Sequence, residues 1–215
     1  MAKGKIIILC IAVFIFSLNY SNSCTTSVNK VTESINVFKG FNGIKEKTGQ
    51  NDGYWVERFL AVCGLKKGNP WCAAMLAFGF DSVGVKAPLS AYSPTWFKQN
   101  VIYFPKDSIN LCTPDSADVF GIYFKENKRV AHVGIIIHWG DGSYCQTFEG
   151  NTNDNGSREG LYAMYRWRPK KNIYIVARYA CRTFPYIIEE SKNPSIHLNK
   201  NNENKLQPSS TLSLK

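Results

Sequence analysis

The 215-residue sequence has few of the residues that build metal sites and few long apolar segments. It has no Cys-x-x-Cys pair and only three histidines, so a structural zinc site is not expected. No stretch after the first 18 residues is long and apolar enough to span a membrane. No internal repeat is visible, which argues against a solenoid or an array of small modules.

Apolar residues and positive charge, by contrast, are plentiful. The chain is 44% apolar and 13% aromatic, which is enough to form the core of one folded domain and excludes disorder throughout. The formal net charge of +10 suits polyanionic surroundings such as wall polymers, anionic lipid or nucleic acid. A solvated basic surface without a specific partner explains the charge equally well.

The N-terminus has the features of an export signal. Positive residues precede the short apolar run 6–16, which predicts a signal peptide over residues 1–23. Ser21 and Ser23 are the small residues that cleavage before Cys24 requires. Cys24 leaves lipid anchoring to a membrane open as an alternative. Export and the lack of an RNA-binding motif argue against nucleic acid as a partner.

The remaining chain divides by composition into three parts. Residues 24–40 are polar and predict a tether, and residues 189–215 are rich in Asn, Lys and Ser and predict a disordered tail. Between them, residues 41–188 are expected to form a single domain that acts as a monomer.

The pattern of this domain is helical first and strand-like later. A helix is expected over 54–63, and a second, buried helix is expected to begin at Asn69-Pro70 and end before Gly84. Strand patterns then follow at 119–124, 130–139, 144–149, 161–167 and 173–179. This order predicts an α+β fold with N-terminal helices packed on an antiparallel β-sheet.

Cys72 is the first candidate for chemistry. A thiolate is a strong nucleophile, and the start of a helix lowers the pKa of a thiol by placing partial positive charge beside it. Cys72 lies in the first turn of the second helix. A buried structural cysteine is the alternative at that position, so a second group is needed.

His132 is the histidine best placed to act with Cys72. His197 lies in the polar tail, and His138 is expected at the surface beside a turn. The two histidines of the strand are six residues apart, or roughly 20 Å, so only one can belong to a given site. His132 opens the strand, where a side chain can face a cleft.

The following hairpin supplies a third group. If the Asp-Gly pair at 141–142 forms a two-residue turn, Gly134 lies opposite Glu149 and His132 lies opposite Asn151. The side chains of His132, Glu149 and Asn151 then share one face, where a carboxylate or an amide can orient the imidazole. A slip of one residue would place Glu149 and Asn151 on the opposite face.

The other cysteines of the mature chain allow two interpretations. An exported protein meets an oxidising compartment, so four cysteines can form two disulfides. They can equally remain buried thiols. These residues are Cys63, Cys112, Cys145 and Cys181.

Five segments, in matching order over about residues 45–180, resemble a CHAP-domain protein, a papain-like amidase or peptidase of the bacterial cell wall. Three carry most of the resemblance: Gly-Asn-Pro-Trp-Cys-Ala-Ala at 68–74, Ala-His-Val-Gly-Ile at 131–135 and Thr-Phe-Glu-Gly-Asn-Thr at 147–152. The segments at 51–57 and 155–160 add to it.

The resemblance implies a papain-like catalytic domain over 41–188 that hydrolyses an amide in peptidoglycan, either the sugar-to-peptide amide or a bond in the stem or cross-bridge. Cys72 corresponds to the nucleophile, His132 to the base and Glu149 to the residue that orients it, with Asn151 as a supporting polar residue. No acidic calcium loop is visible, so no metal or other cofactor is expected. An exported location in the periplasm or at the cell surface follows.

Other assignments remain open. The backbone N–H of Cys72 is one expected oxyanion donor, and Asn69 is a candidate for the second. Some arginines and tryptophans are candidates to line a substrate groove, with solvation or core packing as the alternative: Arg158, Arg166, Arg168, Trp71 and Trp96. A catalytically silent wall-binding module and an exported antibacterial toxin are the alternative functions.

Overall fold

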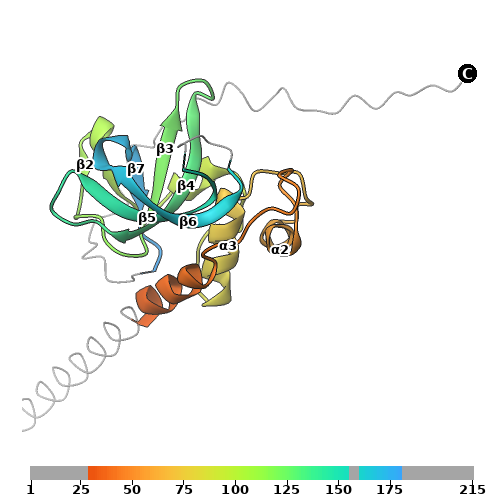
Figure 1. The fold of residues 1–215 in the computed structure, drawn as a ribbon. Helices are drawn as coiled ribbons and strands as arrows, with labels where there is room; N and C mark the ends of the chain where they lie inside the picture. The colour runs from red at the N-terminus through yellow and green to blue at the C-terminus, as the bar shows by residue number, and fades with distance from the viewer. Residues whose placement is uncertain (1–28, 155–159, 181–215) are drawn as a thin grey trace, which may run out of the picture. The chain divides into compact units, whose positions relative to one another are not determined.

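The computed structural model describes residues 29–154 and 160–180 (Figure 1). The predicted signal peptide, Cys24, Arg158, Cys181 and the predicted tail lie outside the described residues. No helix in the described part of the chain is long and apolar enough to cross a membrane.

The described residues form three α-helices and seven strands, so the predicted α+β class is confirmed. Residues 29–40 are helical, and α2 (Tyr54–Val62) and α3 (Cys72–Ser82) follow. The strands are β1 (Val101–Phe104), β2 (Ile109–Asn110), β3 (Val119–Phe124), β4 (Arg129–His138), β5 (Tyr144–Thr152), β6 (Tyr162–Pro169) and β7 (Ile175–Ala177). Short 3₁₀ helices are η1 (Ser93–Phe97), η2 (Pro105–Asp107) and η3 (Lys170–Asn172).

The seven strands form one antiparallel sheet in the order β2-β1-β7-β3-β4-β5-β6. Strands β3, β4, β5 and β6 are neighbours both along the chain and in the sheet, as consecutive antiparallel strands commonly are. The last strand, β7, returns to lie between β1 and β3 (Figure 1). The centre of the sheet is therefore assembled from segments that are distant in sequence.

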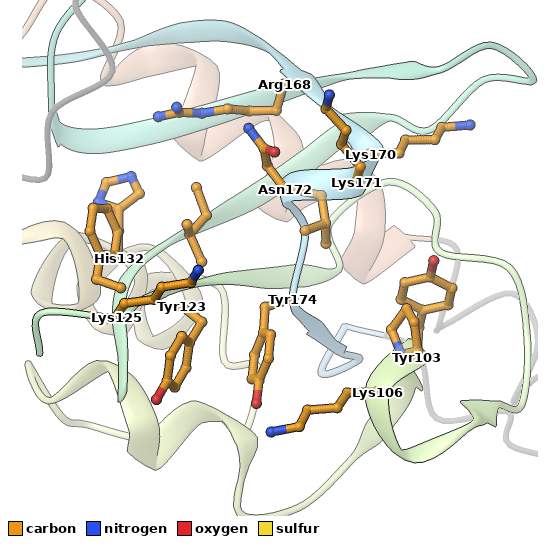
Figure 2. Close-up of a pocket in the computed structure, with 14 residues that line it drawn as sticks. Tyr103, Lys106, Tyr123, Lys125, His132, Arg168, Lys170, Lys171, Asn172 and Tyr174 are labelled. Carbon is orange, nitrogen blue, oxygen red and sulfur yellow. The ribbon is translucent and has the colours of Figure 1, made fainter. Parts of the chain in front are cut away.

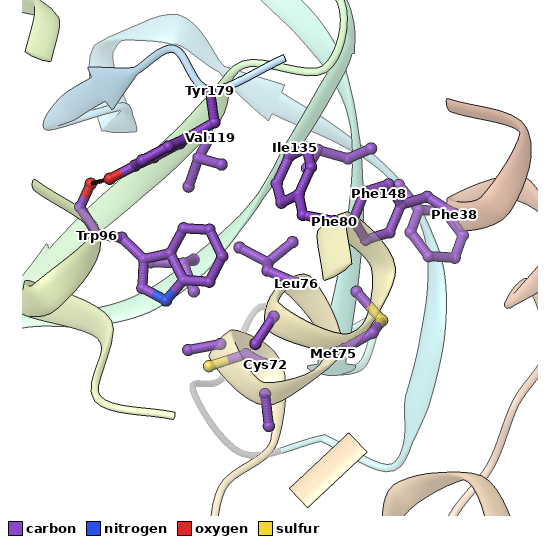
Figure 3. Close-up of a cluster of buried hydrophobic side chains, with 14 of the residues drawn as sticks. Phe38, Cys72, Met75, Leu76, Phe80, Trp96, Val119, Ile135, Phe148 and Tyr179 are labelled. Carbon is purple, nitrogen blue, oxygen red and sulfur yellow. Dashed lines mark hydrogen bonds between the residues drawn. The ribbon is translucent and has the colours of Figure 1, made fainter. Parts of the chain in front are cut away.

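Apolar side chains are buried in two clusters. The larger cluster combines α3 with alternate residues of the strands, such as Val119 and Ile135 (Figure 3). The smaller cluster contains Phe120 and Ile136, the neighbours of those residues. Because successive residues of a strand point to opposite faces, the two clusters lie on opposite faces of the sheet.

The helix at 29–40 differs from the polar tether expected there. Phe38 is fully buried, and its ring meets that of Phe80 edge-to-face with centroids 5.3 Å apart. A Cβ atom on Gly79 would lie 2.5 Å from the Phe38 ring, so the helix approaches α3 closely at this glycine. This segment therefore belongs to the folded domain. Its apolar residues recur at helical spacing, so one face of the helix can pack on α3.

The start of one later helix also differs in detail from expectation. Helix α3 begins at Cys72 with Trp71 as its N-cap, two residues after the expected Pro70 start. Helix α2 begins after Gly53, and the nearby Asp52 carboxylate binds the backbone N–H and the hydroxyl of Thr48.

Candidate active site

Cys72 is the first residue of α3 and is almost fully buried, with 3% of its surface exposed. Its own backbone N–H belongs to the first turn of the helix and so has no intrahelical partner. The rest of α3 is apolar and packed in the larger core cluster, which fixes the position of the thiol. The sulfur lies 3.9 Å from the hydroxyl of Ser93, a buried residue of η1.

His132 on β4 binds Glu149 on β5. The imidazole Nε2–H donates to Oε2 of Glu149 across 2.8 Å, and both side chains are buried. The sequence predicted that these two residues share a face, and the structure confirms it.

The predicted register of the hairpin holds at its centre but not at its turn. Ile135 pairs with Phe148 and Ile136 with Thr147, as a two-residue Asp-Gly turn would require. Nearer the turn the register shifts by one residue, because His138 pairs with Gln146. An irregularity in β4 thus accommodates a turn that differs from the predicted one. Beyond this irregularity the predicted register is kept, and Glu149 stays beside His132.

Gly134 explains why the two strands can bring Glu149 so close. A Cβ atom at this position would lie 2.8 Å from Cγ of Glu149 and 2.7 Å from the carbonyl oxygen of Phe148. Only glycine leaves space there for the carboxylate side chain. This contact also agrees with the predicted pairing of Gly134 opposite Glu149.

Arg168 on β6 completes the contacts of Glu149. Its guanidinium donates from Nε to Oε1 at 2.7 Å and from Nη2 to Oε2 at 2.5 Å, a bidentate pair. The Thr147 hydroxyl donates to Oε1 at 2.7 Å. The sequence suggested Arg168 only as a groove residue, and the pairing of β5 with β6 is what brings it to the carboxylate.

The imidazole and the thiol of Cys72 influence each other's protonation. Because Nε2 binds Glu149, Nδ1 is the nitrogen left for Cys72, although it makes no hydrogen bond of regular geometry within the described chain. Such contacts are often long or poorly aligned in free enzymes and tighten when substrate binds.

The electrostatics of the site favour a charged pair. Burial raises the pKa of the Cys72 thiol, but His132, the backbone N–H of Val133 and the Ser93 hydroxyl together hold it below its ordinary value. Burial lowers the pKa of His132, but Cys72 and Glu149 outweigh this effect and raise it to about 9. Both shifts favour the pair of a thiolate and an imidazolium over the neutral thiol and imidazole.

Glu149 stays ionised in spite of its complete burial. Burial raises the pKa of this carboxyl, but the hydrogen bonds from Arg168 and His132 hold it well below its usual range. A buried carboxylate is tolerated only when it is paired and hydrogen-bonded, and both conditions are met here.

Asn151 is buried close to the site but has a different partner from the one expected. Its Oδ1 accepts the backbone N–H of Gly160 at 3.2 Å, while Nδ2 has no hydrogen-bond partner in the described chain. The residue has a φ of 54°, at a shift in the β5–β6 register. No described contact joins Asn151 to His132.

The remaining candidates lie elsewhere. Trp71 is buried, stacks on Phe59 and donates its indole N–H to Glu46, and Trp96 is buried in the core. The side-chain amide of Asn69 donates to the Lys66 carbonyl oxygen, so the structure does not support it as an oxyanion donor. Two further side chains lie away from the site: exposed His138, and Arg166, which binds Asn153 and Asp154.

The described cysteines are all free thiols: Cys63, Cys72, Cys112 and Cys145. Burial raises the pKa of Cys63 and of Cys145 to about 11, so neither is activated in the way that Cys72 is. Among residues 29–154 and 160–180, no group of three or more potential ligands gathers to hold a metal ion.

Comparisons with known proteins add little. No family model matches the sequence, and no curated protein matches it. One solved structure, "The crystal structure of Ly7917", is similar over 70% of this chain, with 13% sequence identity and a TM-score of 0.39. This chain spans 62% of the length of that protein. At this level of similarity nothing about the function of the present chain follows.

Proposed function

We propose that this protein is an exported cysteine hydrolase that cleaves an amide bond in peptidoglycan. The observation that carries the proposal is the buried contact of His132 with Glu149, 2.8 Å long, beside a cysteine that opens a helix. A nucleophile, a base and a group that orients the base are the three parts that such catalysis requires.

The proposed reaction uses each group in turn. The Cys72 thiolate attacks the amide carbon, and the backbone N–H of Cys72 stabilises the oxyanion. His132 gives its Nδ1 proton to the leaving amine, so a thioester forms as the C–N bond breaks. His132 then accepts a proton from water as the water attacks the thioester, which releases the acid and restores the thiolate.

Glu149 and Arg168 act through His132 in this scheme. Glu149 holds the ring through Nε2–H and stabilises the imidazolium, so that Nδ1 stays aimed at the thiol. Arg168 keeps Glu149 ionised and fixes its plane through the bidentate pair. Arg168 is therefore a positioning residue.

The resemblance of the sequence to CHAP-domain proteins supports peptidoglycan as the substrate. We extend the proposal to a papain-like arrangement, in which the helices cover the sheet and α3 presents Cys72 to the strand that carries His132. The export signal expected over 1–23 suits a substrate outside the cytoplasmic membrane. An antibacterial toxin would use the same chemistry on the wall of another cell.

A catalytically silent wall-binding module is the second candidate. The burial of Cys72 favours it, because a substrate must displace whatever covers the sulfur before attack is possible. This candidate and the hydrolase predict opposite results when Cys72 is changed.

The test compares the wild-type protein with Cys72→Ser on purified peptidoglycan, with Cys63→Ser as the control for loss of a thiol away from the site. Wild type and Cys63→Ser should release soluble muropeptides, detected by mass spectrometry, and Cys72→Ser should release none while it unfolds at the same temperature. Equal release by Cys72→Ser would refute the hydrolase, and no release by wild type would favour the silent module.

A further inference from the structure

A second feature adjoins the site on the side of His132 and Arg168. It is a cavity of about 780 Å³ at the ends of β3, β4 and β6, closed on one side by η2 and η3 (Figure 2). His132 and Arg168 line both this cavity and the candidate active site. The cavity therefore adjoins the candidate active site through these two residues, although Cys72 does not line it.

The lining of the cavity carries one sign of charge. Among the described residues, five cationic side chains line it and no carboxylate does: Lys106, Lys125, Arg168, Lys170 and Lys171. A cleft lined by one sign of charge concentrates ligands of the opposite sign.

Two of these cations already have partners, and three do not. Arg168 is bound to Glu149, and Lys170 donates to the Gly140 carbonyl oxygen and lies over the Trp139 ring. Within residues 29–154 and 160–180, the ammonium groups of Lys106, Lys125 and Lys171 make no hydrogen bond or ion pair. Like charges gathered in this way are stabilised when an anion joins them.

The cavity also offers apolar surface. The rings of Tyr123 and Tyr174 lie beside each other with centroids 4.9 Å apart, and Ile122 and Ile173 contribute aliphatic groups. A ligand that combines a carboxylate with aliphatic groups would match both the charge and the apolar surface, as a peptide with acidic residues does.

We propose that this cavity, lined by Lys106, Lys125 and Lys171, is an anionic subsite that binds a carboxylate of the peptide whose amide is cleaved at Cys72. The subsite rests on the proposed function, because it names what that site selects: stem peptides with free carboxylates over those with amidated ones. Its lysines set substrate affinity and leave the reactivity of the thiol unchanged.

Binding is measured in the Cys72→Ser protein, so that no turnover interferes. The probes are a synthetic muramoyl tripeptide with free carboxylates and the same tripeptide with its carboxylates amidated. The free acid should bind about tenfold more tightly, and Lys125→Gln with Lys171→Gln should remove that difference, because each exposed charge contributes a few-fold at most. Added salt should weaken the binding of the free acid more than the binding of the amidated tripeptide.

The matched control is Lys39→Gln with Lys86→Gln, which removes the same charge from exposed residues that do not line the cavity. This variant should bind both probes like the parent. In the wild-type background, the cavity variant should raise KM with kcat unchanged, and iodoacetamide should alkylate Cys72 at the wild-type rate.

Equal affinity for the free-acid and the amidated tripeptide would overturn the subsite. An equal loss of affinity for the free acid in the control variant would also overturn it. Binding of poly(glycerol phosphate) through the same lysines, without binding of the tripeptide, would overturn it too and indicate a wall polymer as the ligand. Carboxylate-dependent binding in a protein that releases no muropeptides would retain the subsite and refute the hydrolase, so the two proposals fail separately.

Discussion

Three ionisable side chains are buried in contact, and Cys72 is electrostatically coupled to them through His132. Arg168 is positive and Glu149 negative, and the pKa shifts favour a positive imidazole at His132 and a negative sulfur at Cys72. Each charge is neutralised by its neighbour, which is how a dry interior tolerates four such groups. In the proposed mechanism the reactivity of Cys72 therefore depends on Glu149 and Arg168, which act on it through His132.

The Glu149→Gln substitution tests this dependence. Without the carboxylate, His132 loses an interaction that raises its pKa, so the pKa should fall below about 9. The alkaline limb of kcat/KM should then move to lower pH, because the leaving amine needs the imidazolium as its proton donor. We expect kcat/KM at neutral pH to fall about 100-fold or more.

The matched control for that measurement is Glu57→Gln on the exposed surface of α2, which should leave the profile unchanged. An unmoved alkaline limb in a folded Glu149→Gln protein would show that Glu149 does not act on His132.

At the scale of elements, the hairpin shows what local sequence determines. Alternation along β4 and β5 was enough to place His132 and Glu149 on one face, although the turn itself was predicted wrongly. The bulge that corrects the register lies between Ile136 and His138, and no local pattern reveals it. The pairing of Arg168 with Glu149 was not predicted for a related reason. The alternation of residues along β6 does not show which residue of β5 lies beside Arg168.

The helix at 29–40, by contrast, was not predicted although the local sequence contains the signal for it. Its polar composition predicted a tether, but Val31, Ile35 and Phe38 recur at intervals of four and three residues, which is the spacing of one helix face. That signal was present and was outweighed by composition. The burial of the face depends on Gly79 of α3, which local sequence does not indicate.

The Phe38→Ala substitution measures how much this helix contributes. Removal of a fully buried ring should lower the free energy of unfolding by about 3–5 kcal/mol, measured by urea denaturation. Asn36→Ala on the exposed side of the same helix should change it by about 0.5 kcal/mol or less. A change equally small for Phe38→Ala would mean that the segment is a tether after all.

At the scale of the whole chain, the sequence predicted the α+β class, and the described residues confirm it. Five of the 26 Lys and Arg residues of the chain line the cavity beside His132. Neither the cavity nor the pairing of β7 with β1 and β3 was visible in the sequence, because both depend on segments far apart along the chain.

The assignment of Cys72 as an activated nucleophile is tested most directly by alkylation with iodoacetamide at pH 6, followed by peptide mass mapping. Cys72 should react at least about tenfold faster than Cys63 and Cys145, whose pKa values burial raises to about 11. The advantage should disappear in His132→Gln. A Cys72 that stays unmodified at pH 6, or that reacts only as the pH approaches 9, would contradict the assignment.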